Sequence, residues 1–158
     1  MKRALIAAVA SVTLLATTGL LAQDGGPHDK AIKARQALMQ IYSFNLGILG
    51  GMAKEEVEYD ADAAQAAADN LLAAATMNQS AMWPAGSDSE NAENSKNRAL
   101  PAMWENFPKV AEAGNALATA ATDMQGAAGG GLDALKGAMG AAGKSCKGCH
   151  DDFRAERK

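Results

Sequence analysis

The sequence predicts an all-α protein folded as an antiparallel four-helix bundle, with a covalently held group near its C-terminal end. Apolar residues recur every three or four positions over four long segments, as on one face of a helix. No segment shows the strict apolar and polar alternation of a half-buried strand, and the connections allow successive helices to run antiparallel. The two cysteines of the chain stand three positions apart in the last segment.

Residues 1–22 are expected to be a secretory signal peptide. Lys2 and Arg3 precede an uncharged, mostly apolar run that ends at Ala22, before the polar residue Gln23. This run is nearly long enough to cross a bilayer, so an uncleaved anchor is the alternative, and earlier cleavage sites stay open. The pattern indicates export, with residues 23–158 forming the mature domain.

Charge and length restrict the function of the mature domain. Removing residues 1–22 lowers the number of basic side chains from 15 to 13, against 18 acidic ones, which leaves a net charge near −5. This balance argues against nucleic-acid binding, which needs a basic footprint. The remaining length of about 136 residues suits a single domain with one core.

The first two helices are predicted from periodicity and capping. Helix 1 covers residues 28–49 and is expected to end at Gly50 and Gly51, while Asp60 is a plausible N-cap for an alanine-rich helix 2 that reaches about Asn78. The inward face predicted for helix 1 consists of Ile32, Arg35, Met39, Tyr42, Leu46 and Leu49.

A long polar loop separates the two halves of the bundle. Residues 79–97 contain proline, glycine, serines, acids and amides, and loops of this length in compact domains tend to be functional. Pro101 suits a short helical piece, and Pro108 suits the first turn of helix 3, which runs to about Gln125. Helix 4 is predicted over residues 132–157.

The motif that carries chemistry lies on helix 4. Cys146, Lys147, Gly148, Cys149 and His150 form the C-x-x-C-H signature for attachment of c-type haem. The two cysteines, one turn apart, bond the vinyl groups of the porphyrin, and the adjacent histidine places an imidazole nitrogen under the iron. The motif continues the apolar stripe of helix 4: Leu132, Leu135, Met139, Ala142, Cys146, Cys149, His150 and Phe153.

Other roles for these cysteines fit less well. A disulfide that closes so short a loop constrains little of the unfolded chain. A thioredoxin-like pair needs a preceding strand and a βαβ context, which the sequence lacks. A structural zinc site needs four protein ligands. The only other histidine, His28, lies beside Pro27 near the start of the mature chain, far in sequence from the cysteines.

Several further segments resemble one family. Besides the motif region 144–154, residues 34–39 (Ala-Arg-Gln-Ala-Leu-Met) look like a first-helix pattern, and residues 82–87 and 99–104 look like a loop pattern, of the class II cytochromes c. The chain most closely resembles cytochrome c prime, in which a four-helix bundle carries the haem motif at its C-terminal end. The resemblance spans most of the mature chain.

The resemblance implies roles for individual residues and for the whole protein. His150 is expected to be the proximal iron ligand of one haem c, and Met39 to cover the opposite face. Arg35 is expected near the haem propionates and Arg154 near the proximal side. Without the resemblance, Met39 would pass for a core methionine and Arg35 for a snorkelling helix arginine. The family further implies a periplasmic homodimer.

The first hypothesis for function is a five-coordinate haem that binds the diatomic gases nitric oxide (NO) and carbon monoxide (CO). Helix 1 offers Leu38, Met39, Tyr42 and Phe44 but no distal histidine, so bound oxygen would gain little stabilisation. The runner-up is electron transfer to redox partner proteins, with the Met39 sulfur as sixth ligand. An enzyme such as a peroxidase is disfavoured, because no second histidine is placed to act as acid or base at the haem.

The dimer is expected to form through helices 1 and 2. Small side chains there would let two helices approach closely, and the candidates are Ala63, Ala64, Ala67 and Ala68.

Overall fold

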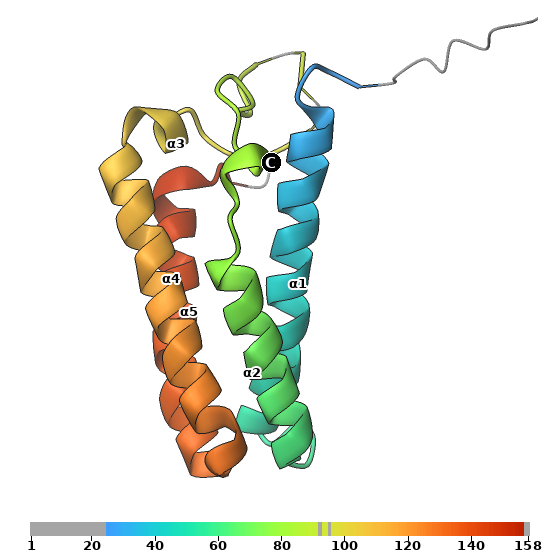
Figure 1. Ribbon diagram of the computed structural model, residues 1–158, viewed down its shortest axis with the longest axis vertical. Helices are drawn as coiled ribbons and strands as arrows, with labels where there is room; N and C mark the ends of the chain where they lie inside the picture. The colour runs from blue at the N-terminus through green and yellow to red at the C-terminus, as the bar shows by residue number, and fades with distance from the viewer. Residues whose placement is uncertain (1–24, 92, 95, 157–158) are drawn as a thin grey trace, which may run out of the picture.

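The computed structural model describes residues 25–91, 93–94 and 96–156, so the expected signal peptide at 1–22 lies outside the described residues. Four long helices form the bundle: α1 (Asp29–Ala53), α2 (Ala61–Thr76), α4 (Phe107–Ala127) and α5 (Leu132–Phe153) (Figure 1). Two 3-10 turns, η1 (Ser80–Met82) and η2 (Ala128–Gly130), and the short helix α3 (Ala102–Glu105) complete the elements. The predicted all-α four-helix bundle is confirmed.

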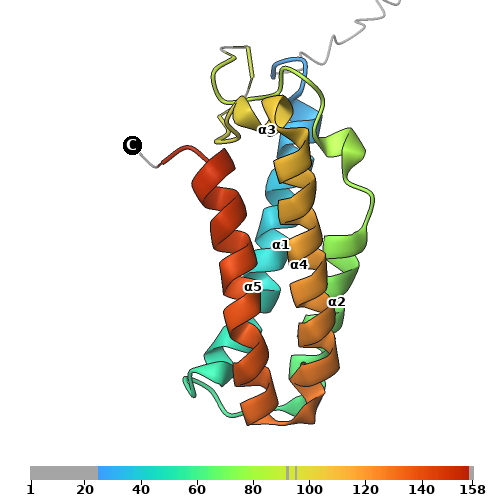
Figure 2. The same cartoon turned by 90° about the vertical axis from the view of Figure 1, so that its left-hand side faces the viewer.

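The four long helices make a closed ring of contacts. Within this ring α1 packs on α2, α2 on α4, α4 on α5, and α5 again on α1. Across 25–91, 93–94 and 96–156, no helix is both long enough and apolar enough to pass through a membrane. The connection between α2 and α4 lies across the end of the bundle at which α5 finishes (Figures 1 and 2).

Side-chain caps fix where two helices begin. Asp60 is the N-cap of α2, as predicted, and its carboxylate accepts a hydrogen bond from the Ala63 amide at 2.9 Å. The Asn106 side chain caps α4 by accepting from the Lys109 amide at 3.4 Å, and Pro108 stands in the first turn, where its missing N–H costs nothing.

Helix α1 does not end at Gly50 and Gly51, contrary to the sequence prediction. Gly50 is buried inside the helix and faces Met139 of α5, and the Lys54 amide donates to the Gly50 carbonyl at 3.0 Å. The left-handed residue that follows the helix is Glu55, with φ of 61°. The glycines therefore serve the packing of α1, while a non-glycine residue takes the turn conformation.

Helix α5 ends four residues earlier than predicted. Arg154 has extended backbone angles and forms an antiparallel bridge with Ala99, a residue of the connection between α2 and α4. The Leu100 amide also donates to the Phe153 carbonyl at 3.0 Å. Pairing with a distant loop segment thus replaces the last predicted helical turn, and helical periodicity carries no signal for such a contact.

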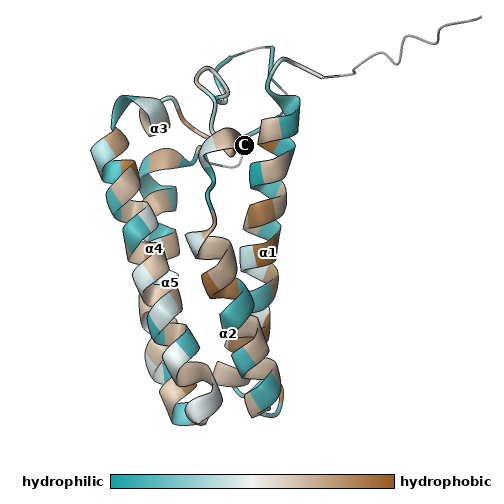
Figure 3. Ribbon diagram, in the orientation of Figure 1, coloured by the Kyte–Doolittle hydropathy of each residue, from teal (hydrophilic) through white to brown (hydrophobic). Residues whose placement is uncertain are grey.

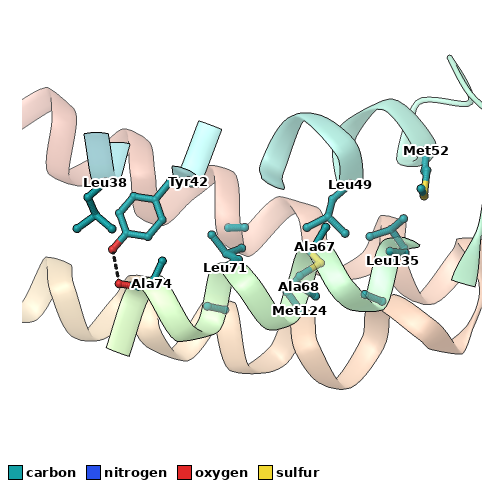
Figure 4. Packing of buried hydrophobic residues seen from close by; sticks show 14 residues of the cluster. Leu38, Tyr42, Leu49, Met52, Ala67, Ala68, Leu71, Ala74, Met124 and Leu135 are labelled. Carbon is teal, nitrogen blue, oxygen red and sulfur yellow. Dashed lines mark hydrogen bonds between the residues drawn. The ribbon is translucent and has the colours of Figure 1, made fainter. Parts of the chain in front are cut away.

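The core lies along the axis of the bundle. Leu49, Leu71, Met124 and Leu135 have no exposed surface, and Figure 4 shows their side chains placed along the space between the helices. Truncating a leucine at such a site costs about 2–5 kcal/mol of stability. In Figure 3 apolar and polar residues alternate around each helix, as expected when one stripe packs inward.

Three of the four alanines predicted for the dimer contact belong to this core. Ala64, Ala67 and Ala68 are at most 3% exposed, and only Ala63 faces solvent. Ala64, Ala67 and Ala68 therefore let the helices of one bundle approach closely, and these three residues do not supply a surface for a second copy. That part of the sequence prediction was wrong.

Candidate functional site

Helix α5 presents Cys146, Cys149 and His150 to the interior of the bundle. The buried residues Ala142 and Phe153, 0% and 4% exposed, lie on the same face one turn before and one turn after the motif. Neither cysteine takes part in a disulfide, and all three motif side chains are only half-buried. The inward face of α5 is thus covered less completely at the motif than on either side of it.

Met39 shows the same incomplete cover on α1. It lies one turn after Arg35 and one turn before Tyr42, so the three side chains share the inward face. Arg35 and Tyr42 are 3% and 5% exposed, whereas Met39 is 38% exposed. The neighbouring Leu38 is only 3% exposed, so Leu38 is the core residue of this turn. This exposure favours a contact between Met39 and the cofactor over a place in the protein core, and the role of Met39 stays a prediction.

The two incompletely covered surfaces face each other. Burial is the main cause that raises the pKa of Tyr42; a hydrogen bond from Gln79 opposes this shift, and the neighbouring Cys146 thiol adds to it. Tyr42 of α1 and Cys146 of α5 are therefore neighbours across the bundle. A flat apolar group attached at Cys146 and Cys149 would extend toward Met39, so the residues fit a haem between α1 and α5.

The ionisation of the motif suits attachment and ligation. Burial raises the pKa of both thiols, which keeps Cys146 and Cys149 protonated near neutral pH and slows their oxidation to a disulfide. Burial, followed by the positive charges of Arg154 and Arg98, lowers the pKa of His150. The imidazole is therefore neutral at neutral pH and keeps a nitrogen lone pair for the iron.

The two arginines of the predicted site have different surroundings. Arg154 is exposed, follows α5 directly and lowers the pKa of His150 through its charge, which places it near His150. Arg35 is buried, and its terminal nitrogens donate to acceptors in the connection between α2 and α4. Its predicted closeness to the haem propionates stays a prediction.

Sequence reasoning missed the partners of Arg35. Ser87 and Asn97 accept hydrogen bonds from the guanidinium, and Trp83 and Trp104 stack on it. All four residues belong to loops or short elements, whose spatial neighbours leave no periodic trace in the sequence. The signals that this region had a specific task were the length of the loop and the resemblance of residues 82–87 and 99–104 to the loop pattern of the family.

Comparisons with known proteins agree with this site. A family profile described as Cytochrome C' matches residues 30–154. Cytochrome c-554 of Cereibacter sphaeroides is 42% identical over 149 residues, which cover 94% of this chain and 96% of that protein. A solved structure, "Cytochrome c' from Rhodobacter Spheriodes", superimposes with a TM-score of 0.77 at 32% identity and covers 81% of this chain and 97% of that one.

Another solved cytochrome c', described as having an unusual ligand-controlled dimer dissociation, has a TM-score of 0.74 and 30% identity, and covers 80% of this chain and 95% of that one. The profile match includes Cys146, Cys149 and His150. The covalent haem c of this family agrees with two cysteines that form no disulfide and with the neutral imidazole described above. The chain is a monohaem c-type cytochrome and belongs to the cytochrome c' family.

Proposed function

We propose that this cytochrome binds NO and CO at a five-coordinate haem, with His150 as the one protein ligand and Met39 as a movable cover on the opposite side. One observation carries the proposal: Met39 faces inward on α1 but is left 38% exposed, between the covered residues Arg35 and Tyr42. A haem attached through Cys146 and Cys149 and ligated by His150 would supply an iron that binds a diatomic gas or a second protein ligand.

The side chains around Met39 support the choice of gas. The Tyr42 hydroxyl donates to the Ala74 carbonyl oxygen at 2.9 Å and accepts from Gln79 at 3.0 Å. The Asn45 amide nitrogen donates within its own helix, to the Ile41 carbonyl at 2.8 Å. Because Tyr42 and Asn45 donate to protein carbonyls, this arrangement favours CO and NO, which need no hydrogen-bond donor, over oxygen.

Electron transfer is the second candidate. It is favoured by the position of Met39, which lies one turn from both Arg35 and Tyr42 and so is placed to ligate the iron as well as to cover it. In this case the Met39 thioether would be the sixth ligand, which raises the reduction potential, and redox proteins would be the partners. Neither candidate is an enzyme.

Export and dimerisation belong to the same proposal. The charged and apolar pattern of residues 1–22 supports export to the periplasm. An exposed apolar patch on α1 and the turn after it supports a homodimer, because Ile41, Phe44 and Val57 are 47%, 69% and 54% exposed and Phe44, Ile48, Met52 and Val57 line a surface groove.

Gas titration of the ferrous holoprotein tests the proposal. We expect saturable CO and NO binding with little or no stable oxygen complex. If neither CO nor NO changes the absorption spectrum at millimolar concentration, a second protein ligand occupies the iron. Electron transfer then replaces gas binding as the proposed function.

A further inference from the structure

Arg35 is the most completely enclosed charged side chain described near the site, with 3% of its surface exposed. Nη1 donates to Ser87 Oγ at 2.7 Å and to the Met82 carbonyl at 3.3 Å. Nη2 donates to the Ser87 carbonyl at 2.5 Å and to Asn97 Oδ1 at 3.1 Å. All four N–H bonds of the two terminal nitrogens are thus directed at protein acceptors.

Two indoles complete the enclosure. The guanidinium carbon lies 4.7 Å from the ring centroid of Trp83 and 5.8 Å from that of Trp104. The Trp104 ring nitrogen donates to the Trp83 carbonyl at 3.2 Å, so the two stacking residues are bound to each other. A planar guanidinium makes these contacts and the paired hydrogen bonds at once, which a lysine ammonium does not.

The loop residues that directly follow Asn97, one of the acceptors of Arg35, are paired with the end of α5. We call residues 87–89 and 97–100 the bridging segment. Its two parts are joined by the Ser89 amide, which donates to the Ala99 carbonyl at 2.8 Å. Leu100 donates to the Phe153 carbonyl at 3.0 Å, and the Ala155 amide donates to the Arg98 carbonyl at 2.9 Å. The bridging segment therefore runs from the Arg35 turn of α1 to the residues that follow His150.

We propose that Arg35 is a positioning residue that, through the bridging segment, holds the Met39 turn of α1 at a fixed separation from the His150 turn of α5. Met39 lies one turn beyond Arg35, and Phe153 lies one turn beyond His150. The inference rests on the proposed function only in assigning Met39 and His150 to opposite faces of the haem. It holds whether Met39 covers the iron or ligates it.

This role differs from neutralising a haem carboxylate, which the family resemblance implies for Arg35. A carboxylate partner needs the charge of the side chain and one or two free N–H groups. Here the terminal nitrogens are committed, and only the Nε–H is without an acceptor among the contacts described above. The shape of the guanidinium, in addition to its charge, is therefore what the site uses.

Two substitutions in the haem-loaded protein separate shape from charge. Arg35→Lys keeps the positive charge but loses the planar group with its paired N–H donors, whereas Arg35→Gln loses both the charge and the guanidinium. We expect both to accelerate hydrogen exchange at the Ser89, Leu100 and Ala155 amides by about tenfold or more, since each charge-assisted hydrogen bond is worth about a factor of ten. We also expect both to raise CO affinity, because a less restrained Met39 moves aside more easily.

Further variants keep the test decisive if the Arg35 variants fail to mature. Ser87→Ala with Asn97→Ala removes two acceptors and leaves Arg35 in place, and should give the same changes at smaller size. Lys30→Gln, at an exposed position of α1, is the matched control for loss of charge and should behave like the wild type.

The outcomes separate this inference from the proposed function. If Arg35→Lys restores wild-type exchange and CO affinity while Arg35→Gln does not, charge alone matters and the inference is overturned. It is equally overturned if the Ser87 and Asn97 double variant exchanges as slowly as the wild type. The spin state of the wild-type iron tests the proposed function independently, because the bridging segment acts on Met39 in either role.

Discussion

Arg35 and Met39 stand one helical turn apart on the inward face of α1, yet 3% of Arg35 and 38% of Met39 is exposed. The protein itself covers the arginine, through Ser87, Asn97 and two tryptophans. It leaves the methionine facing the level of Cys146 and His150. This difference in exposure divides α1 into a turn that anchors the loop, at Arg35, and a more exposed turn, at Met39.

Substituting His150 separates attachment from ligation, because the thioether bonds and the iron bond are made by different residues. We expect His150→Ala matured in a periplasm to keep the mass of one haem in denaturing mass spectrometry but to lose the native absorption spectrum. An unchanged visible spectrum would show that another residue ligates the iron. The double variant Cys146→Ala and Cys149→Ala is the control, and its polypeptide should carry no haem mass.

Removing the Tyr42 hydroxyl should lower stability and leave gas binding unchanged. Tyr42→Phe removes the 2.9 Å hydrogen bond to the buried Ala74 carbonyl, at a cost of about 1–2 kcal/mol in chemical denaturation. Burial raises the pKa of Tyr42 above its ordinary 10.0. The contribution of the protonated hydroxyl to the free energy of unfolding is therefore present below pH 10 and is lost as pH rises through the raised pKa.

The control for Tyr42 is Tyr59, which lies between α1 and α2, away from the haem motif. Its hydroxyl donates to the carbonyl of Ala128 in η2 at 2.7 Å. Tyr59→Phe should cost a similar amount of stability. CO affinity should stay within about twofold of the wild type in both variants, which is less than 0.5 kcal/mol. A large fall in oxygen or CO affinity in Tyr42→Phe alone would mean that the hydroxyl contacts the bound gas.

The dimer surface on α1 is tested by Phe44→Asp. Phe44 is 69% exposed and its substitution removes an apolar contact and adds charge, so we expect a monomer in sedimentation at concentrations where the wild type is a dimer. Phe107→Asp is the matched control, because Phe107 is 72% exposed on α4 and should leave the dimer intact. Monomeric wild type at high micromolar concentration would remove the dimer from the account.

Periodicity and the haem motif were enough to predict the four helices and the inward placement of Cys146, Cys149 and His150, because both depend on spacing along one helix. They failed where a distant segment decides the outcome. The early end of α5 depends on the bridge between Arg154 and Ala99, and the burial of Arg35 depends on loop residues more than 45 positions away. The inward alanines of α2 were misassigned because small residues permit close packing within a bundle as well as between bundles.

Met39→Ala tests the cover directly. If Met39 must move aside for an entering gas, its removal should raise CO affinity about ten- to a hundredfold, since overpacking of about 1–3 kcal/mol is relieved and each 1.4 kcal/mol is about tenfold. The spin state of the iron should not change. Unaltered CO affinity in a high-spin protein would mean that Met39 neither covers nor ligates the iron.

The coordination of the iron in the wild type is the central claim, and the absorption spectrum of the ferric and ferrous holoprotein measures it most directly. With His150 as the single protein ligand, we expect high-spin spectra in both oxidation states and a shift to a low-spin spectrum when CO is added to the ferrous protein. A low-spin ferric spectrum with a methionine-to-iron charge-transfer band would contradict the five-coordinate site and identify Met39 as the sixth ligand of an electron-transfer protein.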